Sequence, residues 1–297
     1  MGKFGISQPV KRREDVRLLT GQGSFVEDAT RPGMVHGCMV RSPHAHARIA
    51  RLDTAPAEAA AGVLAVFTGA DLEAKGVRAI PTAHTFPAKA GTEIVEHGYP
   101  TLAHEVARYA GDGVAFVVAE TDAEARDAAD LIEVDYESLA VAIGCAEAAK
   151  TGAPLVWPDA PGNLAFQWET GDAAAARDAF AKAAHVVALD VVNNRIVQNP
   201  METRNALAEW DAGAGKLTLT TGTQMPHLVR DQLLEVLGLE PPSVRVVTED
   251  VGGGFGGKNG LYPEQVLVTL AARRLGRPVM WSGQRGEAFL SEAHARD

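Results

Sequence analysis

The residues with the clearest chemical potential form one glycine-rich segment, residues 252–258, which reads GGGFGGK. Because glycine lacks a Cβ atom, this backbone can approach a ligand closely and direct several N–H groups toward it. Phe255 is the single bulky residue among the glycines, and it would place an apolar wall beside those donors. The segment therefore predicts a ligand-binding loop, and a glycine-rich turn that packs against a helix is the structural alternative.

The loop fits the dinucleotide-binding motif incompletely. Residues 252–257 satisfy the spacing G-x-G-x-x-G, but a Rossmann loop opens directly into a helix and has an acidic residue about 20 positions further on. Here Tyr262 and Pro263 come before the next helix can begin, and position 277 is arginine. The dinucleotide interpretation stays open but is not favoured.

The P-loop motif fits to a similar degree. Gly252, Gly257 and Lys258 occupy its positions, yet Asn259 stands where that motif needs a serine or threonine for Mg²⁺. A loop for a ligand of another kind is favoured, because Phe255 lies in the middle of the segment.

Other candidates for chemistry have simpler structural explanations. His44 and His46 form an H-x-H pair, but two histidines without nearby acids or cysteines rarely bind a metal, so loop packing is favoured. Cys38 lies in an apolar run and is expected to be a small buried hydrophobe. Glu202 and Arg204 are expected either to lie near a bound ligand or to form a structural ion pair.

Composition and charge exclude several classes of protein. The 297 residues are 46% hydrophobic and 22% charged, which excludes a disordered chain, and a net charge of −10 makes nucleic acid an unexpected partner. Two cysteines cannot form a disulfide framework, or by themselves hold a four-cysteine zinc site or an iron–sulfur cluster. No segment is long and apolar enough to span a bilayer and no apolar leader is present, so we expect a cytoplasmic protein without a membrane span.

The elements that must position these residues fall into two regions. In the first region, residues 55–61 predict a short helix, and Thr121 followed by Glu124 predicts a capped helix over 121–132. The strands predicted for this region are 35–40, 62–67, 114–119 and 133–136. This mixture indicates a small α/β or α+β domain.

The second region follows a turn-rich junction at 148–162. Its predicted strands are 185–192, 217–220, 244–247 and 278–281, and its predicted helices are 172–184, 226–237 and 263–275. Gly238 and Gly276 are expected to end the last two helices. The order strand, helix, strand, glycine loop, helix and strand indicates an α/β layer with the loop at its functional edge.

Residues 250–258, DVGGGFGGK, resemble the molybdopterin-contacting loop of the xanthine dehydrogenase, aldehyde oxidase and carbon monoxide dehydrogenase family. Further segments resemble the same family in the same order, so the resemblance covers nearly the whole chain. These segments are REDVRLLTG at 13–21, RSPHAHARI at 41–49, FTGADL at 67–72, VDY at 134–136, NPMETR at 199–204, TQMPH at 223–227 and GRPV at 276–279.

The resemblance implies an α+β chain, in which an α/β-hammerhead domain at 12–147 is followed by the first part of a molybdenum-cofactor-binding α/β domain at 163–297. The implied cofactor is molybdenum bound to molybdopterin, in the cytosine dinucleotide form if the protein is bacterial.

The resemblance also implies roles for individual residues. By motif position, Gln224 would donate a hydrogen bond to an oxo ligand of molybdenum, and a strand-end amide that caps the next helix is the alternative. The backbone of Phe255, with Gly253, Gly254 and Gly256, would face the metal centre and the pterin.

Two departures from the family pattern bear on function. Asn259 stands where purine-oxidising members carry a substrate-binding glutamate, and a neutral amide cannot relay a proton as a carboxylate does. We therefore expect small aldehydes or N-heteroaromatic compounds rather than xanthine, unless Asn259 merely caps the loop. Residues 111–113 also lack the proline usual in that family segment.

The family's catalytic glutamate base lies in a later part of longer subunits, and no residue here can be assigned to it. We expect this chain to be a fragment or one half of a split subunit.

The resemblance implies a molybdenum hydroxylase that oxidises an aldehyde, an N-heteroaromatic or a related small substrate with oxygen derived from water. Because this chain has neither cluster cysteines nor an FAD motif, its electrons are expected to pass to an iron–sulfur subunit with [2Fe-2S] clusters and an FAD subunit. A second molybdopterin-binding polypeptide is a further expected partner if the subunit is split. The alternatives are a non-catalytic assembly or scaffold subunit, and a nucleotide-binding protein that uses the glycine loop.

Overall fold

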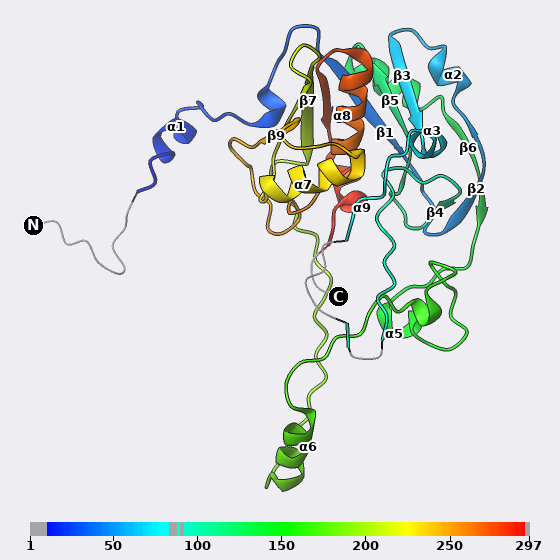
Figure 1. Ribbon diagram of the computed structural model, residues 1–297, viewed down its shortest axis with the longest axis vertical. Helices are drawn as coiled ribbons and strands as arrows, with labels where there is room; N and C mark the ends of the chain where they lie inside the picture. The colour runs from blue at the N-terminus through cyan, green and yellow to red at the C-terminus, as the bar shows by residue number, and fades with distance from the viewer. Residues whose placement is uncertain (1–10, 83–87, 90–91, 295–297) are drawn as a thin grey trace, which may run out of the picture.

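The computed structural model describes residues 11–82, 88–89 and 92–294, and its main feature is a mixed seven-stranded sheet (Figure 1). In spatial order its strands are β3 (Val63–Thr68), β5 (Gly113–Ala119), β1 (Val35–Arg41), β10 (Val279–Ser282), β7 (Asn205–Asp211), β8 (Lys216–Thr221) and β9 (Val244–Val247). A smaller antiparallel sheet contains β4 (Val106–Ala107), β2 (Ala47–Asp53) and β6 (Glu133–Ser138). The expected α+β fold is confirmed.

Helices flank the large sheet and connect its strands. The described helices are α1 (Asp15–Leu19), α2 (Ala55–Glu58), α3 (Gly69–Ala74), α4 (Asp122–Ala129), α5 (Cys145–Ala148), α6 (Ala173–Lys182), α7 (Pro226–Leu237), α8 (Pro263–Leu275) and α9 (Arg285–Ser291), with short 3₁₀ turns at Val26–Asp28 and Pro161–Asn163. None of the helices in this part of the chain combines the length and apolar composition needed to cross a membrane.

Strands from both predicted regions share the large sheet. β1 belongs to the first region and β10 to the second, and they pair in parallel, with Val35 opposite Val279 and His36 opposite Met280. β10 in turn pairs with β7, so it joins the strands of the two regions. The two regions therefore form one hydrogen-bonded body rather than two independent sheets.

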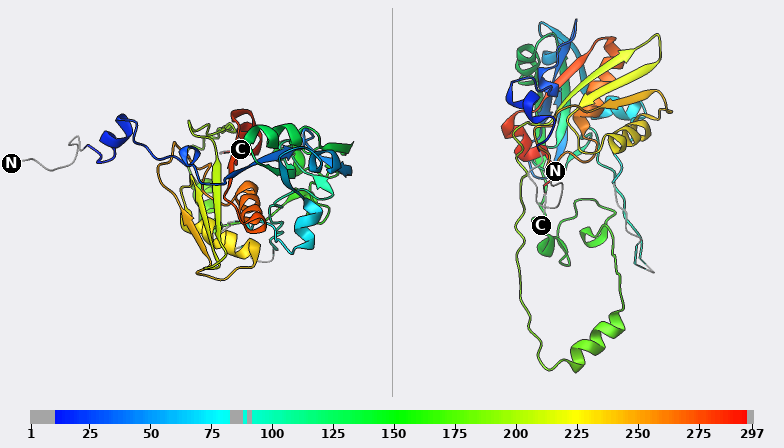
Figure 2. Two further views of the ribbon diagram at one scale, coloured as in Figure 1. Left: turned by 90° about the horizontal axis from the view of Figure 1, so that it is seen from above. Right: turned by 90° about the vertical axis from the view of Figure 1, so that its left-hand side faces the viewer.

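Alternate residues of β5 face opposite layers, because successive side chains of a strand point to opposite faces. Phe116 and Val118 belong to the hydrophobic cluster around α8, whereas Val117 packs in the cluster that contains Ala128 of α4. Figure 2 shows helices on both sides of the sheet. With both of its faces covered, β5 is buried along its whole length.

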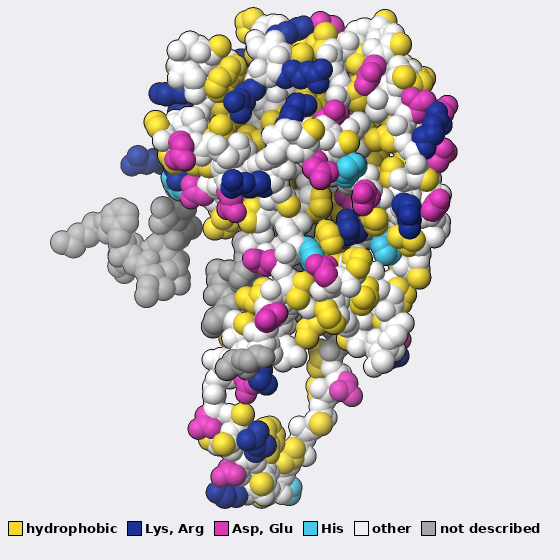
Figure 3. Space-filling view, turned by 45° about the vertical axis from the view of Figure 1, so that its right-hand side comes forward, with side chains coloured by type: hydrophobic (Ala, Val, Ile, Leu, Met, Phe, Trp, Pro, Cys, Tyr) yellow, Lys and Arg dark blue, Asp and Glu magenta, His cyan; other side chains and the backbone are white. Residues whose placement is uncertain are grey.

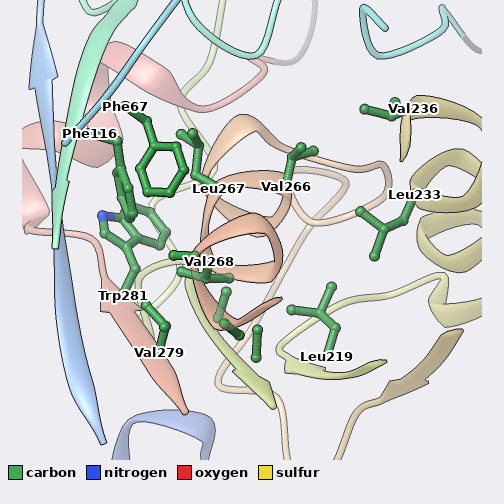
Figure 4. Packing of buried hydrophobic residues seen from close by; sticks show 14 of the residues in the cluster. Phe67, Phe116, Leu219, Leu233, Val236, Val266, Leu267, Val268, Val279 and Trp281 are labelled. Carbon is green, nitrogen blue, oxygen red and sulfur yellow. The ribbon is translucent and has the colours of Figure 1, made fainter. Parts of the chain in front are cut away.

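The core around α8 connects the two regions of the chain. Leu267 is fully buried on α8, and Figure 4 shows it near Phe67 and Phe116 from the first region. Leu219 of β8 and Leu233 of α7 pack in the same cluster on the other side of the helix. One core therefore serves both regions, and α8 has a fixed position between them.

The signals for helix ends are confirmed. Thr121 accepts a hydrogen bond from the N–H of Glu124 at the start of α4, as its spacing predicts. Gly238 and Gly276 end α7 and α8 with φ values of 60° and 64°, in the left-handed region that glycine adopts without strain. The fourth helix ends at Ala129 rather than at residue 132.

The prediction of a strand over 185–192 is wrong for this structure. These residues are irregular, and every residue from 164 to 196 is exposed. Three strands, β2, β4 and β7, were not predicted. β2 carries arginines and aspartate on a partly exposed surface, β4 has only two residues, and β7 directly follows Glu202 and Arg204, which were considered only for a ligand contact or an ion pair. The apolar pattern alone did not determine which segments find a neighbouring strand.

Candidate functional site

The glycine-rich loop lies at the edge of the large sheet where two parallel strands end. β8 and β9 pair in parallel, so their carboxyl ends lie side by side. Gln224 follows β8, and its N–H donates to the carbonyl of Lys258 at the end of the loop that follows β9 (2.9 Å). The hydroxyl of Thr223 donates to the same carbonyl (3.0 Å). Open α/β sheets bind ligands at this kind of edge.

The side chain of Gln224 holds the loop through its oxygen. Gln224 Oε1 accepts hydrogen bonds from the N–H groups of Gly256 (2.9 Å) and Lys258 (3.4 Å). A Cβ atom at Gly254 would lie 2.4 Å from this oxygen, so a larger residue there would displace the Gln224 side chain from the loop. Among the described residues nothing accepts a hydrogen bond from Gln224 Nε2, and the side chain is exposed. The amide therefore has donors left for a ligand.

The helix-capping alternative for Gln224 does not describe its position. α7 begins after Met225, and no side chain caps its first turn. The oxygen that a cap would use is already bonded to the glycine loop.

Three consecutive backbone donors of the loop have no protein acceptor in the described part of the chain. They belong to Gly253, Gly254 and Phe255, whereas the N–H groups on either side are bonded to Glu202, Gln224 or the loop itself. Successive backbone N–H groups without a protein acceptor can form an anion-binding concavity. The loop therefore suits a ligand that carries phosphate or other acceptor oxygens.

Phe255 has a conformation that bulky residues rarely adopt. Its φ is 50°, between Gly253 at 101° and Gly256 at 92°, and its side chain is 71% exposed. A non-glycine residue in the left-handed region stores backbone strain, which is typical of ligand sites. The loop is thus held in an uncommon shape that presents an aromatic ring and its neighbouring N–H groups.

A buried ion pair between Glu202 and Lys258 links the two ends of the glycine loop. Lys258 Nζ donates to the Glu202 carboxylate (2.8 Å) and to the Glu202 carbonyl (3.0 Å), and only 2% of the lysine side chain is exposed. The same carboxylate accepts from the N–H of Gly252 (2.8 Å), and the N–H of Glu202 donates to the carbonyl of Gly252 (3.1 Å). Glu202 therefore holds both ends of the loop.

The Glu202–Lys258 pair decides between the alternatives for Lys258 as a P-loop lysine and for Glu202 as a partner of Arg204. A P-loop lysine reaches the phosphates of its nucleotide, but the ammonium of Lys258 is buried against Glu202 and does not point outward. Glu202 and Arg204 do not pair with each other, because Glu202 pairs with Lys258 and Arg204 pairs with Glu264. The sequence reasoning missed the pair, although both of its residues lie in segments that resemble the same family.

Asn259 lies at a cavity of about 460 Å³ beside the loop. Gly256 and Tyr262 line the same cavity, and the side chain of Asn259 is exposed, without a hydrogen bond to another described residue. Its amide can therefore donate to or accept from a molecule in the cavity.

Two phenols form part of the cavity wall. The hydroxyl groups of Tyr99 and Tyr109 are hydrogen-bonded to each other, and burial raises the pKa of both. Glu292 also lines the cavity, and burial raises the pKa of its carboxyl group. The wall offers neutral hydroxyl groups and one carboxyl group that burial makes easier to protonate.

A network of buried charged residues contacts the cavity wall at Tyr262. The Glu264 carboxylate on α8 accepts from Arg204 Nη1 (2.6 Å) and from Arg41 Nη2 (2.5 Å), and Arg204 lies over the ring of Tyr262 (3.9 Å). Burial opposes the ionisation of Glu264, but the two guanidinium groups prevail and lower its pKa to about 2. The network connects β1 of the first region to α8 and β7 of the second.

The N-terminal segment contacts Asp250, two residues before the glycine loop begins. Arg17 donates to both carboxylate oxygens of Asp250, at 2.7 Å for the Nη2 contact, and the N–H of Ser24 donates to Asp250 as well (2.7 Å). These hydrogen bonds from Arg17 and Ser24 lower the pKa of Asp250 to about 2. Two segments more than 200 residues apart thus meet where the glycine loop begins.

The other sequence candidates lie away from this site. His46 Nδ1 is bonded to the carbonyl of Ala140 (2.8 Å), and His44 packs on the ring of Tyr136, as loop packing predicts. Cys38 packs in the cluster beneath α4, and burial raises the pKa of its thiol to about 11. A thiol with this pKa is a poor nucleophile at neutral pH.

Two family models match successive parts of the chain. Residues 20–140 match the aldehyde oxidase and xanthine dehydrogenase a/b hammerhead domain, and residues 156–297 match the molybdopterin cofactor-binding domain.

Relatives and solved structures match nearly the whole chain. The chain is 38% identical over 296 residues to the nicotine 6-hydroxylase large subunit of Paenarthrobacter nicotinovorans, covering 98% of this chain and 35% of the relative. It is 38% identical over 300 residues to the carbon monoxide dehydrogenase large chain of Afipia carboxidovorans, covering 97% and 36%. The structure of quinoline 2-oxidoreductase from Pseudomonas putida 86 matches with a TM-score of 0.85 at 39% identity, covering 97% of this chain and 36% of that one. The chain thus spans about a third of the length of these proteins.

Proposed function

This chain belongs to the xanthine dehydrogenase, aldehyde oxidase and carbon monoxide dehydrogenase family of molybdenum-dependent oxidoreductases, and we propose that it binds part of a molybdenum–molybdopterin cofactor. The whole subunit then oxidises an aldehyde, an N-heteroaromatic or a related small substrate. When bound, the cofactor supplies the redox chemistry, in which the substrate loses two electrons and water supplies the oxygen atom.

The proposal depends on the Gln224 side-chain amide, whose oxygen and nitrogen have different roles. Its oxygen is occupied by the N–H groups of Gly256 and Lys258, so its Nε2 donors remain for an acceptor atom of the cofactor. The unpaired N–H groups of Gly253, Gly254 and Phe255 lie on the same loop. Together they offer a set of neutral donors, which suits an anionic cofactor rich in oxygen and sulfur acceptors.

The Glu202–Lys258 pair acts on the loop and not on the substrate. By joining Gly252 to Lys258 it keeps the loop donors in place before a ligand arrives. A donor set that is already arranged does not need to reorganise when charge develops during the reaction.

The test of cofactor binding is the molybdenum and pterin content of the large subunit as its host cell assembles it. We expect stoichiometric molybdenum, and a cytosine dinucleotide released on denaturation if the host is a bacterium. A metal-free assembly with the same fold would support a scaffold subunit instead. Saturable binding of a nucleoside triphosphate or dinucleotide at the loop, without molybdenum, would support a nucleotide-binding protein.

The substrate proposal rests on Asn259 at the cavity beside the loop. An asparagine can accept and donate hydrogen bonds but cannot ionise, so the site should favour small aldehydes or neutral N-heterocycles over xanthine. The measurement is kcat/KM for xanthine and for a panel of aldehydes and N-heterocycles. Xanthine as the best substrate would contradict the proposal, and an unchanged panel in Asn259→Ala would show that Asn259 does not contact the substrate.

The proposed partners are an iron–sulfur subunit with [2Fe-2S] clusters and an FAD subunit, which would receive the electrons. A second molybdopterin-binding polypeptide would be a partner if the large subunit is divided between two genes. Purification of the assembly through an affinity tag on this chain, followed by iron and flavin analysis, tests both proposals.

A further inference from the structure

One long excursion leaves the body of the molecule between residues 164 and 196. It descends to α6 and then returns to the sheet along residues 184–195, here named the return arm (Figures 1 and 2). Every residue of the excursion is exposed, and Figure 3 shows hydrophobic side chains along it. The large apolar residues of the return arm are between 58% and 90% exposed: Val186, Val187, Leu189, Val191 and Val192.

The two sides of the excursion differ in their backbone hydrogen bonds. On the outward side, the N–H groups of Lys89 and Val95 donate to the carbonyls of Gln167 (2.7 Å) and Ala165 (2.8 Å). On the return arm, the backbone of residues 184–195 makes no hydrogen bond to any described part of the chain. The outward side is thus tied to the body, whereas the return arm presents unpaired donors and acceptors.

The sequence of the return arm is that of a strand. Residues 185–192 read HVVALDVV, and β-branched residues of this density favour extended backbone. In an extended chain Val187, Leu189 and Val191 would share one face, and Val186 and Val192 would lie on the other. The first face would therefore be apolar, and the second would be mostly apolar but would also carry Asp190 beside Val192. A run in which both faces are mostly apolar is typical of a strand inside a sheet that is covered on both sides.

The helix at the tip of the excursion also lacks a partner in this part of the chain. α6 has ten residues, Asp172 caps its first turn, and no residue of the helix is buried. An isolated helix of this length is marginally stable in water. Phe180 on this helix is 66% exposed, so α6 and the return arm share an apolar surface that the body does not cover.

The return arm is followed along the chain by Glu202, which belongs to the proposed cofactor site. Arg285 holds the segment that follows the arm by donating to the Asn199 side chain (2.8 Å) and to the Met201 carbonyl (2.7 Å). The next residue is Glu202, which holds both ends of the glycine loop. A partner that binds the return arm would therefore lie next to the site.

We propose that the return arm is a strand that forms when the remaining part of the large subunit docks on it. This occupant is the polypeptide that corresponds to the two-thirds of the relatives' length outside this chain. A short peptide could pair with one edge of the arm but could not cover both of its faces. A folded layer of that size can supply neighbouring strands and a cover for each face.

The inference rests on the proposed large subunit but not on its cofactor or substrate. Amide hydrogen exchange is compared between the 297-residue chain and the large subunit as the host cell assembles it, whether on one polypeptide or two. We expect the amides of 184–195 to exchange without protection in the single chain and at least about a hundredfold more slowly in the assembly. The amides of α8 are the internal reference, since they are protected in both samples.

Two outcomes of this experiment would overturn the proposal. One is equally fast exchange of 184–195 in the assembly, which would mean that nothing pairs with the arm. The other is protection in the single chain together with a dimeric mass in sedimentation, which would identify a second copy as the occupant. Protection of the arm in an assembly that lacks molybdenum would contradict the proposed function but not the docking.

Substitutions in the arm test the apolar faces separately. Leu189→Asp on one face and Val186→Asp on the other should each reduce the yield of the assembled subunit at least about tenfold, because a charge would be buried at the interface. The single chain should keep its melting temperature, since these side chains contact no core. Ile143→Asp is the matched control on an exposed apolar residue outside the excursion (76% exposed), and it should assemble normally.

A proline tests the backbone pairing itself. Val191→Pro removes one N–H donor that has no acceptor among the described residues, so the chain should fold as before. Assembly should fail to the same extent as for the aspartate variants. Normal yields of the assembled subunit in Val191→Pro and Leu189→Asp would refute the strand.

Discussion

Two segments of this molecule have similar apolar sequences and opposite environments. β5 (Gly113–Ala119) lies between β3 and β1 and is buried along its whole length. Residues 185–192 are as rich in valine, yet they are irregular and exposed. The difference shows that an apolar run becomes a strand only where neighbouring strands accept its hydrogen bonds and other layers cover its faces.

The largest effect on the free energy of unfolding is expected in the buried charge network around Glu264. Glu264→Gln would leave Arg41 and Arg204 without the carboxylate that they share, and breaking a buried ion pair typically lowers the free energy of unfolding by about 3–5 kcal/mol. Urea denaturation of the single chain measures this. Glu147→Gln, which breaks the exposed pair with Lys150, should change the same quantity by less than about 1 kcal/mol. Equal effects of the two substitutions would contradict the coupling.

Substitution of Gln224 at the glycine loop should lower the activity of the enzyme more than the stability of the chain. Gln224→Ala removes the proposed donor to the cofactor, and one lost donor of this type lowers kcat by about a hundredfold, or about 3 kcal/mol. Its exposed hydrogen bonds to the loop should contribute only about 1 kcal/mol to unfolding. Steady-state kinetics of the assembled enzyme at equal molybdenum content is the measurement. An unchanged kcat would limit Gln224 to a structural role.

The stability of the chain should also depend on pH through the buried carboxyl group of Asp112. Burial raises the pKa of Asp112 from 3.8 to about 6, against the effect of the hydrogen bond from the N–H of Arg108. Its carboxyl group therefore contributes stability below about pH 4, and this contribution is lost as the pH rises through about 6. Relative to the wild type, Asp112→Asn should gain roughly 2–3 kcal/mol between pH 4 and pH 7.

Denaturation curves of both proteins at several pH values test the Asp112 prediction. A difference that stays constant with pH would show that Asp112 titrates normally in the folded state.

The smallest effect is expected in the return arm. Leu189→Ala should change the free energy of unfolding of the single chain by less than about 0.5 kcal/mol, because Leu189 is 83% exposed. Leu267→Ala on α8 is the matched control, and it should lower the same quantity by about 2–5 kcal/mol because it leaves a cavity in the core. A large effect of Leu189→Ala would mean that the arm packs on the body in solution.

Much of the local structure could be predicted from the sequence. Thr121 at the start of α4, and Gly238 and Gly276 at the ends of two helices, act over three or four residues and need no distant partner. The loop over 252–258 was predicted for the same reason, since glycines report directly on backbone freedom.

The contacts within the site could not be predicted in the same way. Glu202 was considered as a partner of Arg204, two positions away, but it pairs with Lys258, which is far along the chain. Arg17 and Asp250 were assigned to separate motifs, and only the fold brings them together. A charged side chain is compatible with any partner of opposite charge, so sequence spacing does not select among distant ones.

The sequence by itself determined the family, the glycine loop, the start of α4 and the ends of α7 and α8, because each depends on residue types within a short window. Tertiary structure alone decided that β1 and β10 join the two regions in one sheet, and that residues 185–192 pair with no strand in the part of the chain that the structure describes. The physical reason is that a strand gains its stability from hydrogen bonds and burial supplied by other segments. Whether those segments are present is a property of the folded assembly and not of the strand's own residues.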